Sequence, residues 1–437
     1  MPTRLHADTV VTCDRDFAVF RPGVVDLGDD GGIDWVGPTH AAPPDPPVVQ
    51  HCDGLLMPGL VNTHCHSPMV MLRGAGEDLP LGRWLKEVIW PREAKLTAED
   101  VYWGMTLASA ELLGFGVTTT CEMYHFSEAI SEAVRDAGSR AIVTAPILVA
   151  EGLEHLGTWE QQLDAALRLA SDDRATDPRV EVGLAAHSAY TVPLEGLAAM
   201  GQAAAEHGLL LHIHVAESQG EAAELEAEHD KTVPAILRDL GVFAGERVLA
   251  AHSVWLTDDD LAIYRDHGVA VAHCPQSNTK LASGLARVTD MLAEGITVGL
   301  GTDGPASNND LDLWEELRLA PLLQRVRTGD AGALPAPVAL AMPTREGAAA
   351  LGRPDLGVLE AGRRADVVHL RTNDPAFTPV VEDAEVISHL MWTAGSRLVR
   401  DVWVDGRQVV ADGTCLTVDV ERAQSEVQQR AERLARG

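Results

Sequence analysis

From Leu55 onward, short apolar runs alternate with longer amphipathic segments that are rich in alanine and leucine. The apolar runs are nearly continuous, as expected of strands that are buried on both faces of a parallel sheet. Eight strands are predicted: Leu56–Thr63, Val117–Met123, Ala141–Leu148, Val180–His187, Leu209–Val215, Val248–His252, Val269–His273 and Thr297–Thr302. The segments between them have apolar residues three and four positions apart, which predicts helices such as Ala98–Leu113, Leu194–His207 and Asp258–His267. This alternation predicts a (β/α)8 TIM barrel, and the absence of a GxGxxG motif after an early strand disfavours a doubly wound open sheet.

Both ends of the chain have a different pattern of short β-type runs. After about residue 355, strands are expected at Gly357-Val358-Leu359, at Ala365–Leu370 and at Val386–Trp392, with another ending in the Asp405-Gly406 turn. We therefore predict a small β-sandwich domain formed by the N- and C-terminal segments. The predicted division is 1–55 and 356–420 for the small β domain, 56–355 for a metal-dependent catalytic barrel, and 421–437 for a terminal helix.

The acidic composition restricts the class of partner. Asp and Glu number 65 against 34 Lys and Arg, a formal net charge of −31. Such a surface repels phosphate backbones and anionic lipids, so neither nucleic acid nor a membrane is an expected partner. The N-terminus has no signal-peptide pattern, and the six scattered cysteines are typical of reduced thiols, so a cytoplasmic protein is expected.

Candidate metal ligands follow several predicted strands at their carboxyl ends, where active sites of (β/α)8 barrels are built. His64 and His66 are two residues apart, so in a strand both side chains point the same way. His214 lies at the end of the fifth strand and Asp303 follows the eighth. Three imidazoles and one carboxylate suit a single divalent metal ion, Zn²⁺ in the first place with Fe²⁺ as the alternative.

This ligand set predicts hydrolytic chemistry, because a bound divalent metal lowers the pKa of water to about 7 and provides a hydroxide nucleophile. Asp303 is expected to take the proton from that water, and His252 to orient it. Glu217 is expected to donate a proton to the substrate, because burial raises the pKa of a carboxyl group. His212 is predicted to lie one layer beneath the metal. Ser277 and Asn278 are interpreted as turn-capping residues.

Three motifs stand out: the ten residues from Met57 to His66, His214-Val215-Ala216-Glu217, and Gly301-Thr302-Asp303-Gly304. In these motifs the sequence resembles the amidohydrolase superfamily. Within it, the stretches Trp84-Leu85, Pro91-Arg92-Glu93 and His187-Ser188-Ala189-Tyr190 resemble the 5-methylthioadenosine/S-adenosylhomocysteine deaminases and the related triazine hydrolases and chlorohydrolases. The resemblance implies that His64, His66, His214 and Asp303 bind one metal ion and that Glu217 and His252 act on the substrate and the water. It further implies that Glu93 binds ribose hydroxyls, His187 contacts the base and Trp84 lines the pocket.

The expected reaction is therefore hydrolytic deamination of an adenosine-like nucleoside, a small-molecule substrate, with release of ammonia. The alternative is the same site acting on an s-triazine, pterin, guanine or cytosine ring, and the remote alternative is a non-catalytic scaffold. By resemblance, the absence of lysine from residues 180–192 indicates one metal ion. The absence of arginine from Thr144–Ile147 disfavours S-adenosylhomocysteine. The resemblance leaves a homo-oligomer open.

Overall fold

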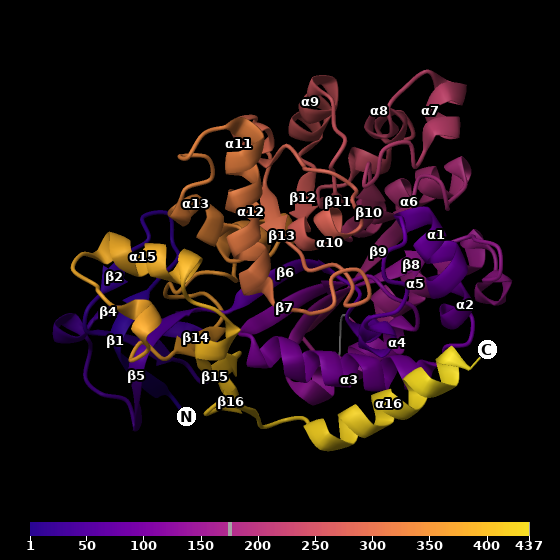
Figure 1. Ribbon diagram of the computed structural model, residues 1–437. Helices are drawn as coiled ribbons and strands as arrows, with labels where there is room; N and C mark the ends of the chain where they lie inside the picture. Colours follow the sequence, from indigo (N-terminus) through magenta and orange to yellow (C-terminus); the bar gives the residue numbers. More distant parts are fainter. Residues whose placement is uncertain (174–176, 437) are drawn as a thin grey trace.

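The computed structural model describes residues 1–173 and 177–436, and its centre is a barrel of eight parallel strands (Figure 1). The strands follow one another around the barrel in sequence order. They are β6 (Leu60–Cys65), β7 (Val117–Glu122), β8 (Arg140–Ile147), β9 (Val180–Ser188), β10 (Leu211–Val215), β11 (Val248–His252), β12 (Ala270–His273) and β13 (Val298–Leu300). The predicted (β/α)8 barrel is confirmed.

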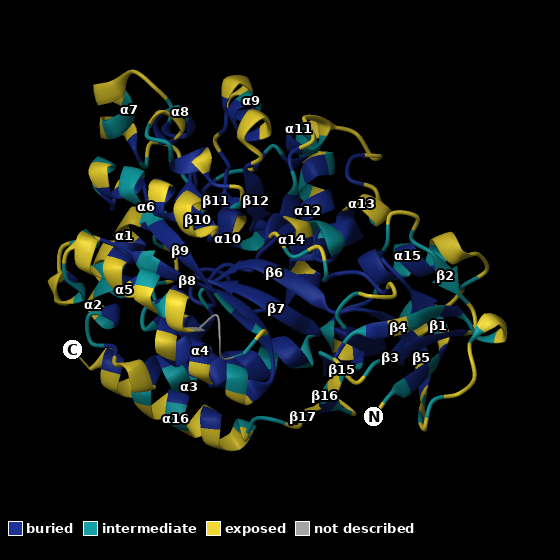
Figure 2. Ribbon diagram, turned by 180° about the vertical axis from the view of Figure 1, so that it is seen from behind, coloured by how far each residue is buried: buried dark blue, intermediate teal, exposed yellow. Residues whose placement is uncertain are grey.

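Helices surround these strands, which are the most deeply buried part of the molecule (Figure 2). The helices from the first barrel strand onward are α1 (Leu81–Trp84), α2 (Trp90–Glu93), α3 (Ala98–Gly114), α4 (Ser127–Ala137), α5 (Trp159–Asp173), α6 (Leu194–His207), α7 (Ala223–His229), α8 (Val233–Asp239), α9 (Asp258–His267), α10 (Pro275–Lys280), α11 (Val288–Ala293), α12 (Leu313–Thr328), α13 (Ala336–Ala341) and α14 (Arg345–Ala350). The bounds of β11, α6 and α9 are those predicted from the sequence.

The first predicted strand, Leu56–Thr63, combines two strands of the structure. Strand β5 (Val48–Pro58) belongs to the terminal sheet, and β6 begins the barrel only at Leu60. Gly59 separates the two strands, and a Cβ atom there would lie 2.1 Å from Thr118 Oγ1. Because both strands are apolar and nearly continuous in sequence, their hydrophobic pattern does not reveal the break.

The barrel closes between its first and last strands beside the predicted metal ligands. Cys65 and Asp303 form an isolated parallel bridge, and the backbone N–H of Asp303 donates to the carbonyl of His64 at 3.0 Å. Below them, the Asn62 side-chain amide donates to Thr302 Oγ1 at 2.8 Å. The seam of the barrel therefore holds predicted metal ligands from the two ends of the sheet next to each other.

The terminal segments form a second sheet of nine strands, in which β1 and β5 are parallel and the other pairs antiparallel. Its strands are β1 (Thr3–Val11), β2 (Val19–Phe20), β3 (Gly23–Leu27), β4 (Ile33–Pro38), β5, β14 (Val367–Leu370), β15 (Val399–Val404), β16 (Arg407–Ala411) and β17 (Thr414–Cys415). Val25 from β3 and Trp403 from β15 share one hydrophobic cluster, so the sheet curls over its own core. The small β domain formed by both ends of the chain is confirmed.

The segment Val386–Trp392, predicted as a strand, is instead part of helix α15 (Asp383–Trp392). The Glu385 carboxylate accepts from the backbone N–H of Glu382 at 3.2 Å, which favours a helix start at this point. The buried residues of the helix are Val386, Ile387, Leu390 and Met391, a spacing that places them on one helical face. The short predicted strand at Gly357-Val358-Leu359 is also wrong, because these residues lie in a bend and an irregular segment.

Helix α16 (Val420–Ala435) follows the small domain and packs along α3, where Arg433 contacts the buried Asp100 carboxylate (Figure 1). The predicted terminal segment 421–437 extends to Gly437, which lies outside the described residues. Over the ranges 1–173 and 177–436, no helix has both the length and the apolar character required to cross a bilayer.

A buried ion cluster joins the barrel to the small domain. Arg140 at the start of β8 is 1% exposed, and its guanidinium donates to both carboxylate oxygens of Asp366 at 3.1 and 3.2 Å. Arg140 also contacts Asp405, whose backbone N–H donates to Asp366 at 2.9 Å. Asp366 therefore links a barrel strand to the turn between β15 and β16.

We expect Asp366→Ala to lower the free energy of unfolding by about 3–5 kcal/mol, because it leaves a buried guanidinium without its main partner. Chemical denaturation followed by circular dichroism would measure the change. Asp8→Ala, at an exposed position on β1, is the matched control and should leave the midpoint unchanged. A midpoint for Asp366→Ala equal to that of the wild type would contradict a stabilising role for this cluster.

Candidate active site

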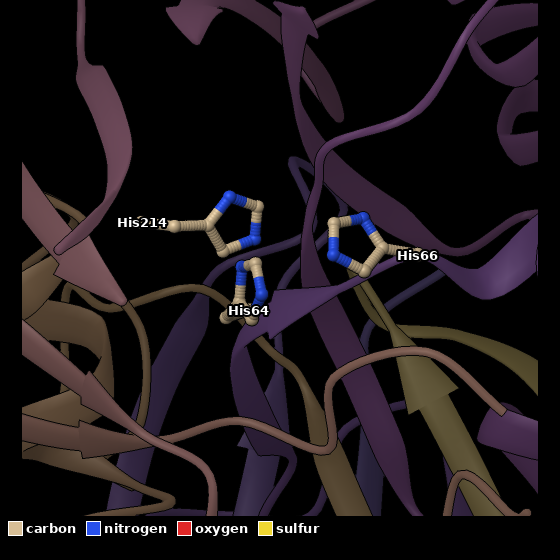
Figure 3. A group of neighbouring side chains, drawn as sticks. All are labelled: His64, His66 and His214. Atoms are coloured by element: carbon tan, nitrogen blue, oxygen red, sulfur yellow. The ribbon is translucent and has the colours of Figure 1, made fainter. Parts of the chain in front are cut away.

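Three histidine rings converge at the carboxyl end of the barrel (Figure 3). His64 lies in β6, His66 follows that strand directly, and His214 lies in β10. The ring centroid of His64 is 4.7 Å from that of His66 and 4.9 Å from that of His214. Each ring offers a nitrogen atom within 4.8 Å of those of the other two.

Hydrogen bonds determine which nitrogen of two of these rings is free. His66 Nδ1 donates to the backbone carbonyl of Met123, and His214 Nδ1 donates to that of His187 at 2.6 Å. A carbonyl oxygen only accepts, so the proton of each neutral ring is on Nδ1 and the lone pair is on Nε2. Metal-binding histidines are commonly oriented by such a bond from their second nitrogen.

The third ring carries a buried nitrogen without a hydrogen bond. His64 is fully buried, and its Nε2 lies 3.4 Å from Asp303 Oδ1 without a hydrogen bond to any described residue. Burial lowers the pKa of His64 to about 3, so the ring is neutral. An unpartnered buried nitrogen is costly unless a ligand or ion binds it.

Asp303 faces the same group from the other side of the barrel seam. Its Oδ1 is 3.2 Å from His66 Nε2, while its Oδ2 accepts from Ser277 Oγ at 2.6 Å and from Ser307 Oγ at 2.9 Å. Burial opposes the charge of this carboxyl group, but contacts with His64 and His66 outweigh burial and hold the pKa well below its usual value. Asp303 is in the left-handed region with φ 61°, a conformation that aspartate tolerates better than most non-glycine residues.

These residues fit a divalent metal ion. His64 belongs to two groups of potential ligands, one with His66 and His214 and the other with His252 and Asp303. Neutral imidazole nitrogens and one ionised carboxylate are donors that such ions prefer, and the orphaned Nε2 of His64 requires a partner of this kind.

Glu217 and His252 lie next to this group. His252 ends β11, and its Nδ1 donates to Asn278 Oδ1 at 2.9 Å, which leaves a lone pair on Nε2. That Nε2 lies 3.9 Å from Glu217 Oε2. Burial raises the pKa of Glu217 well above its usual value, and the nearby Asp303 and Glu221 raise it further. The Glu217 carboxyl group therefore keeps its proton to higher pH than an ordinary glutamate does.

Almost all the site residues predicted from the sequence line one cavity. Its lining includes His66, Trp84, Glu93, His187, His214, Glu217, His252 and Asp303, and the fully buried His64 lies beneath it. A segment after β6 covers the cavity with α1, the π-helical turn Leu85–Ile89 and α2. The Trp84 indole anchors this segment by donating to the carbonyl of Ala75 at 3.1 Å.

Glu93 has two neighbours in the cavity that the sequence did not reveal, Tyr124 and His125. Glu93 is 7% exposed, and its Oε2 lies 3.7 Å from His125 Nε2. Burial alone would raise the pKa of Glu93, but His125 and Tyr124 outweigh it and lower the pKa below its usual value. Their position just after β7 was the available signal, because side chains that follow barrel strands face the site.

Ser277 and Asn278, interpreted from the sequence as turn-capping residues, hold two of the predicted catalytic groups. Ser277 donates to Asp303 and Asn278 accepts from His252. Both side chains belong to α10, whose start directly after β12 directs them toward the centre of the barrel. His187 lies in the cavity with Nδ1 3.0 Å from Thr191 Oγ1, and burial lowers its pKa to about 4.

Curated relatives match nearly the whole chain. A 5-methylthioadenosine/S-adenosylhomocysteine deaminase from Pelotomaculum thermopropionicum is 38% identical over 435 residues, covering 98% of each chain. A 5'-deoxyadenosine deaminase from Methanosarcina mazei is 38% identical over 436 residues, covering 97% of this chain and 96% of the relative.

Solved structures agree with this relationship. An adenosine deaminase from Xanthomonas campestris with bound zinc superimposes with a TM-score of 0.93 at 32% identity, covering 99% of this chain and 98% of that one. An atrazine chlorohydrolase from Arthrobacter aurescens, also with zinc, has a TM-score of 0.89 at 26% identity, covering 98% of this chain and 100% of that one. The pattern of the amidohydrolase family matches residues 55–409. With its barrel, its histidine cluster and these relatives, the chain belongs to the amidohydrolase family.

Proposed function

We propose that this enzyme deaminates adenosine-like nucleosides by hydrolysis and releases ammonia. The observation that carries the proposal is the buried Glu217 carboxyl group beside the three-histidine cluster, in the same cavity as the ionised Glu93. Deaminases of adenosine-type nucleosides among the relatives support the choice of substrate.

The metal ion is proposed to be zinc, held by His64, His66, His214 and Asp303. Neutral imidazole and carboxylate ligands suit zinc, and two related structures contain it. When bound, such an ion lowers the pKa of a coordinated water to about 7 and so favours its attack on carbon.

The side chains around the proposed metal ion then accept and donate the protons of the reaction. Asp303, held in position by Ser277 and Ser307, accepts the proton that the attacking water loses. His252 donates its only proton to Asn278, so its Nε2 can accept a hydrogen bond from that water and fix its direction. Glu217 donates a proton to the ring nitrogen next to the carbon under attack. The proton held by Asp303 then passes to the amino group and the proton of the added hydroxyl passes to Glu217, so the C–N bond breaks, ammonia leaves and both carboxyl groups regain their starting states.

The remaining cavity residues bind the substrate in this proposal. Glu93, as a carboxylate, accepts hydrogen bonds from the two ribose hydroxyls. His187 contacts the base, and Trp84 provides an apolar wall. Of the described residues that line the cavity, none is lysine or arginine. A carboxylate on the substrate would therefore lose its hydration there without gaining a cationic partner, so we propose that the 5' group is uncharged.

An ammonia-release assay over a set of substrates tests the function. We expect adenosine, 5'-deoxyadenosine and methylthioadenosine to be deaminated, with higher kcat/KM than S-adenosylhomocysteine. A rate confined to guanine, cytosine or a triazine would contradict the nucleoside proposal while keeping the same hydrolytic site. No ammonia from any of these compounds with zinc-loaded enzyme would contradict the deaminase proposal itself.

Replacing Glu93 with Gln is expected to lower kcat/KM for adenosine by roughly 10- to 100-fold, because hydrogen bonds to a charged group contribute about 1.5–3 kcal/mol. The loss should occur mainly in KM and should nearly vanish for 2',3'-dideoxyadenosine, which lacks both hydroxyls. Glu87→Gln is the matched control, since Glu87 lies on the same covering segment but is 49% exposed and pairs with Arg83. An equal loss with both substrates would show that Glu93 does not recognise the ribose.

A further inference from the structure

His212 is a buried histidine that the proposed reaction does not use. It lies on β10 two residues before His214, is fully buried, and does not line the cavity. Its Nε2 lies 3.0 Å from Nδ1 of His64, with the two rings nearly perpendicular. His212 therefore contacts a proposed metal ligand from beneath, as its position in the sequence predicts.

The direction of this hydrogen bond follows from the residue on the far side of His212. Thr144 Oγ1 donates its single proton to the backbone carbonyl of Glu122 at 2.7 Å. Toward His212 Nδ1, at 3.2 Å, the same oxygen can then only accept. His212 consequently carries a proton on Nδ1.

His212 holds one proton and not two. A second proton would create a buried cation, and no described carboxylate lies in hydrogen-bond contact with the ring to compensate its desolvation. The neutral ring has its lone pair on Nε2, which accepts the Nδ1–H of His64. The lone pair of His64 is thereby on Nε2, the atom that has no hydrogen bond and lies between Asp303 and the other histidines.

We propose that His212, oriented by Thr144, is a positioning residue that fixes the tautomer of His64 and prepares its Nε2 to bind the divalent metal. The inference rests on the proposed function only in taking His64 as a metal ligand. It assigns to His212 the task that backbone carbonyls perform for His66 and His214. Of these three ligands, His64 alone has its tautomer set by a side chain, so substitution can remove that control.

Zinc binding to the metal-free protein, measured by competition with a chromogenic chelator, tests this inference without an activity assay. We expect His212→Leu to raise the dissociation constant for zinc by about 10- to 100-fold, the usual loss of affinity when the hydrogen-bond partner of a metal ligand is removed. His212→Gln keeps an acceptor on its side-chain oxygen and should recover a large part of the affinity. Thr144→Val should also weaken binding, because His212 would then lose the acceptor that sets its proton.

The matched control is Cys121→Ala. The Cys121 sulfur forms a long hydrogen bond of 3.6 Å with the same His212 nitrogen, so this variant removes that weak contact and changes the packing of His212 but leaves Thr144 in place. Its zinc affinity should equal that of the wild type. Circular dichroism of each metal-free variant checks folding. If His212→Leu fails to fold, the zinc affinity of Thr144→Val alone tests the role of His212.

The outcomes separate this inference from the proposed function. Wild-type protein that binds no zinc would overturn the metal site itself. Tight zinc binding by the wild type, unchanged in the folded His212→Leu variant or in Thr144→Val, would overturn only the role of His212. A loss in Cys121→Ala equal to that in Thr144→Val would indicate packing as the cause, and would also overturn it.

Discussion

Replacing Glu217 with Gln should lower kcat for adenosine deamination by about 10²- to 10⁴-fold while zinc remains bound, the range typical of a lost general acid. Glutamine has a similar shape and a similar hydrogen-bonding reach, but it cannot deliver a proton to the ring nitrogen. The effect should appear in kcat, because the proton moves in the transition state. Ammonia release together with the zinc content of the purified variant would measure both parts of the prediction.

The pH dependence of the deamination rate of the wild type is a second test of the role of Glu217. Burial raises the pKa of Glu217, so the carboxyl group keeps its proton to higher pH than an ordinary glutamate. Since the protonated form is the active one, the rate should decline as the pH rises through this elevated pKa.

Glu224→Gln is the matched control for Glu217→Gln. Glu224 is an exposed glutamate on α7, close to Glu217 in the sequence. It does not line the cavity and should keep the activity of the wild type. Full activity in Glu217→Gln would remove Glu217 from the role of proton donor.

Removing the metal ion is expected to reduce the rate by at least about 10³-fold, because Lewis-acid stabilisation of the transition state contributes several kcal/mol. Activity should return when zinc is added back to the chelator-treated enzyme. Magnesium should not restore it, because that ion prefers oxygen ligands to imidazole.

Variants connect this loss to particular side chains. His66→Ala should neither bind zinc stoichiometrically nor recover on its addition, whereas His51→Ala, at an exposed position on β5, should behave as the wild type. Elemental analysis establishes whether the treated enzyme is metal-free. A metal-free enzyme that deaminates at the full rate would contradict every role proposed here for the histidine cluster.

Much of the barrel could be predicted because most of its strands are short apolar runs separated by amphipathic helical segments. His252 ends β11 as predicted, His214 is the penultimate residue of β10, and Asp303 lies three residues after the end of β13. Barrel geometry then brings these strand ends to one face, so residues distant in sequence could be assigned to one site before any contact was known.

What the sequence did not reveal depends on contacts made by the folded chain. Helix α15 has the apolar content of a strand, and only its buried face and its N-terminal hydrogen bond distinguish it. The partners of Asp303 and His252 come from α10, where serine and asparagine are also ordinary turn residues. Tyr124 and His125 become relevant only because the segment bearing Glu93 folds back over the barrel.

The seam between β6 and β13 has a consequence for how the protein acquires its metal. The hydrogen bond that closes the barrel joins Asp303 to His64, so the same contact completes the sheet and assembles the ligands. A chain still emerging from the ribosome has its paired histidines long before it has this aspartate. If these four side chains hold the metal ion as proposed, all of them are in place only after the eighth strand has been synthesised and docked, so complete metal binding comes late in the maturation of the protein.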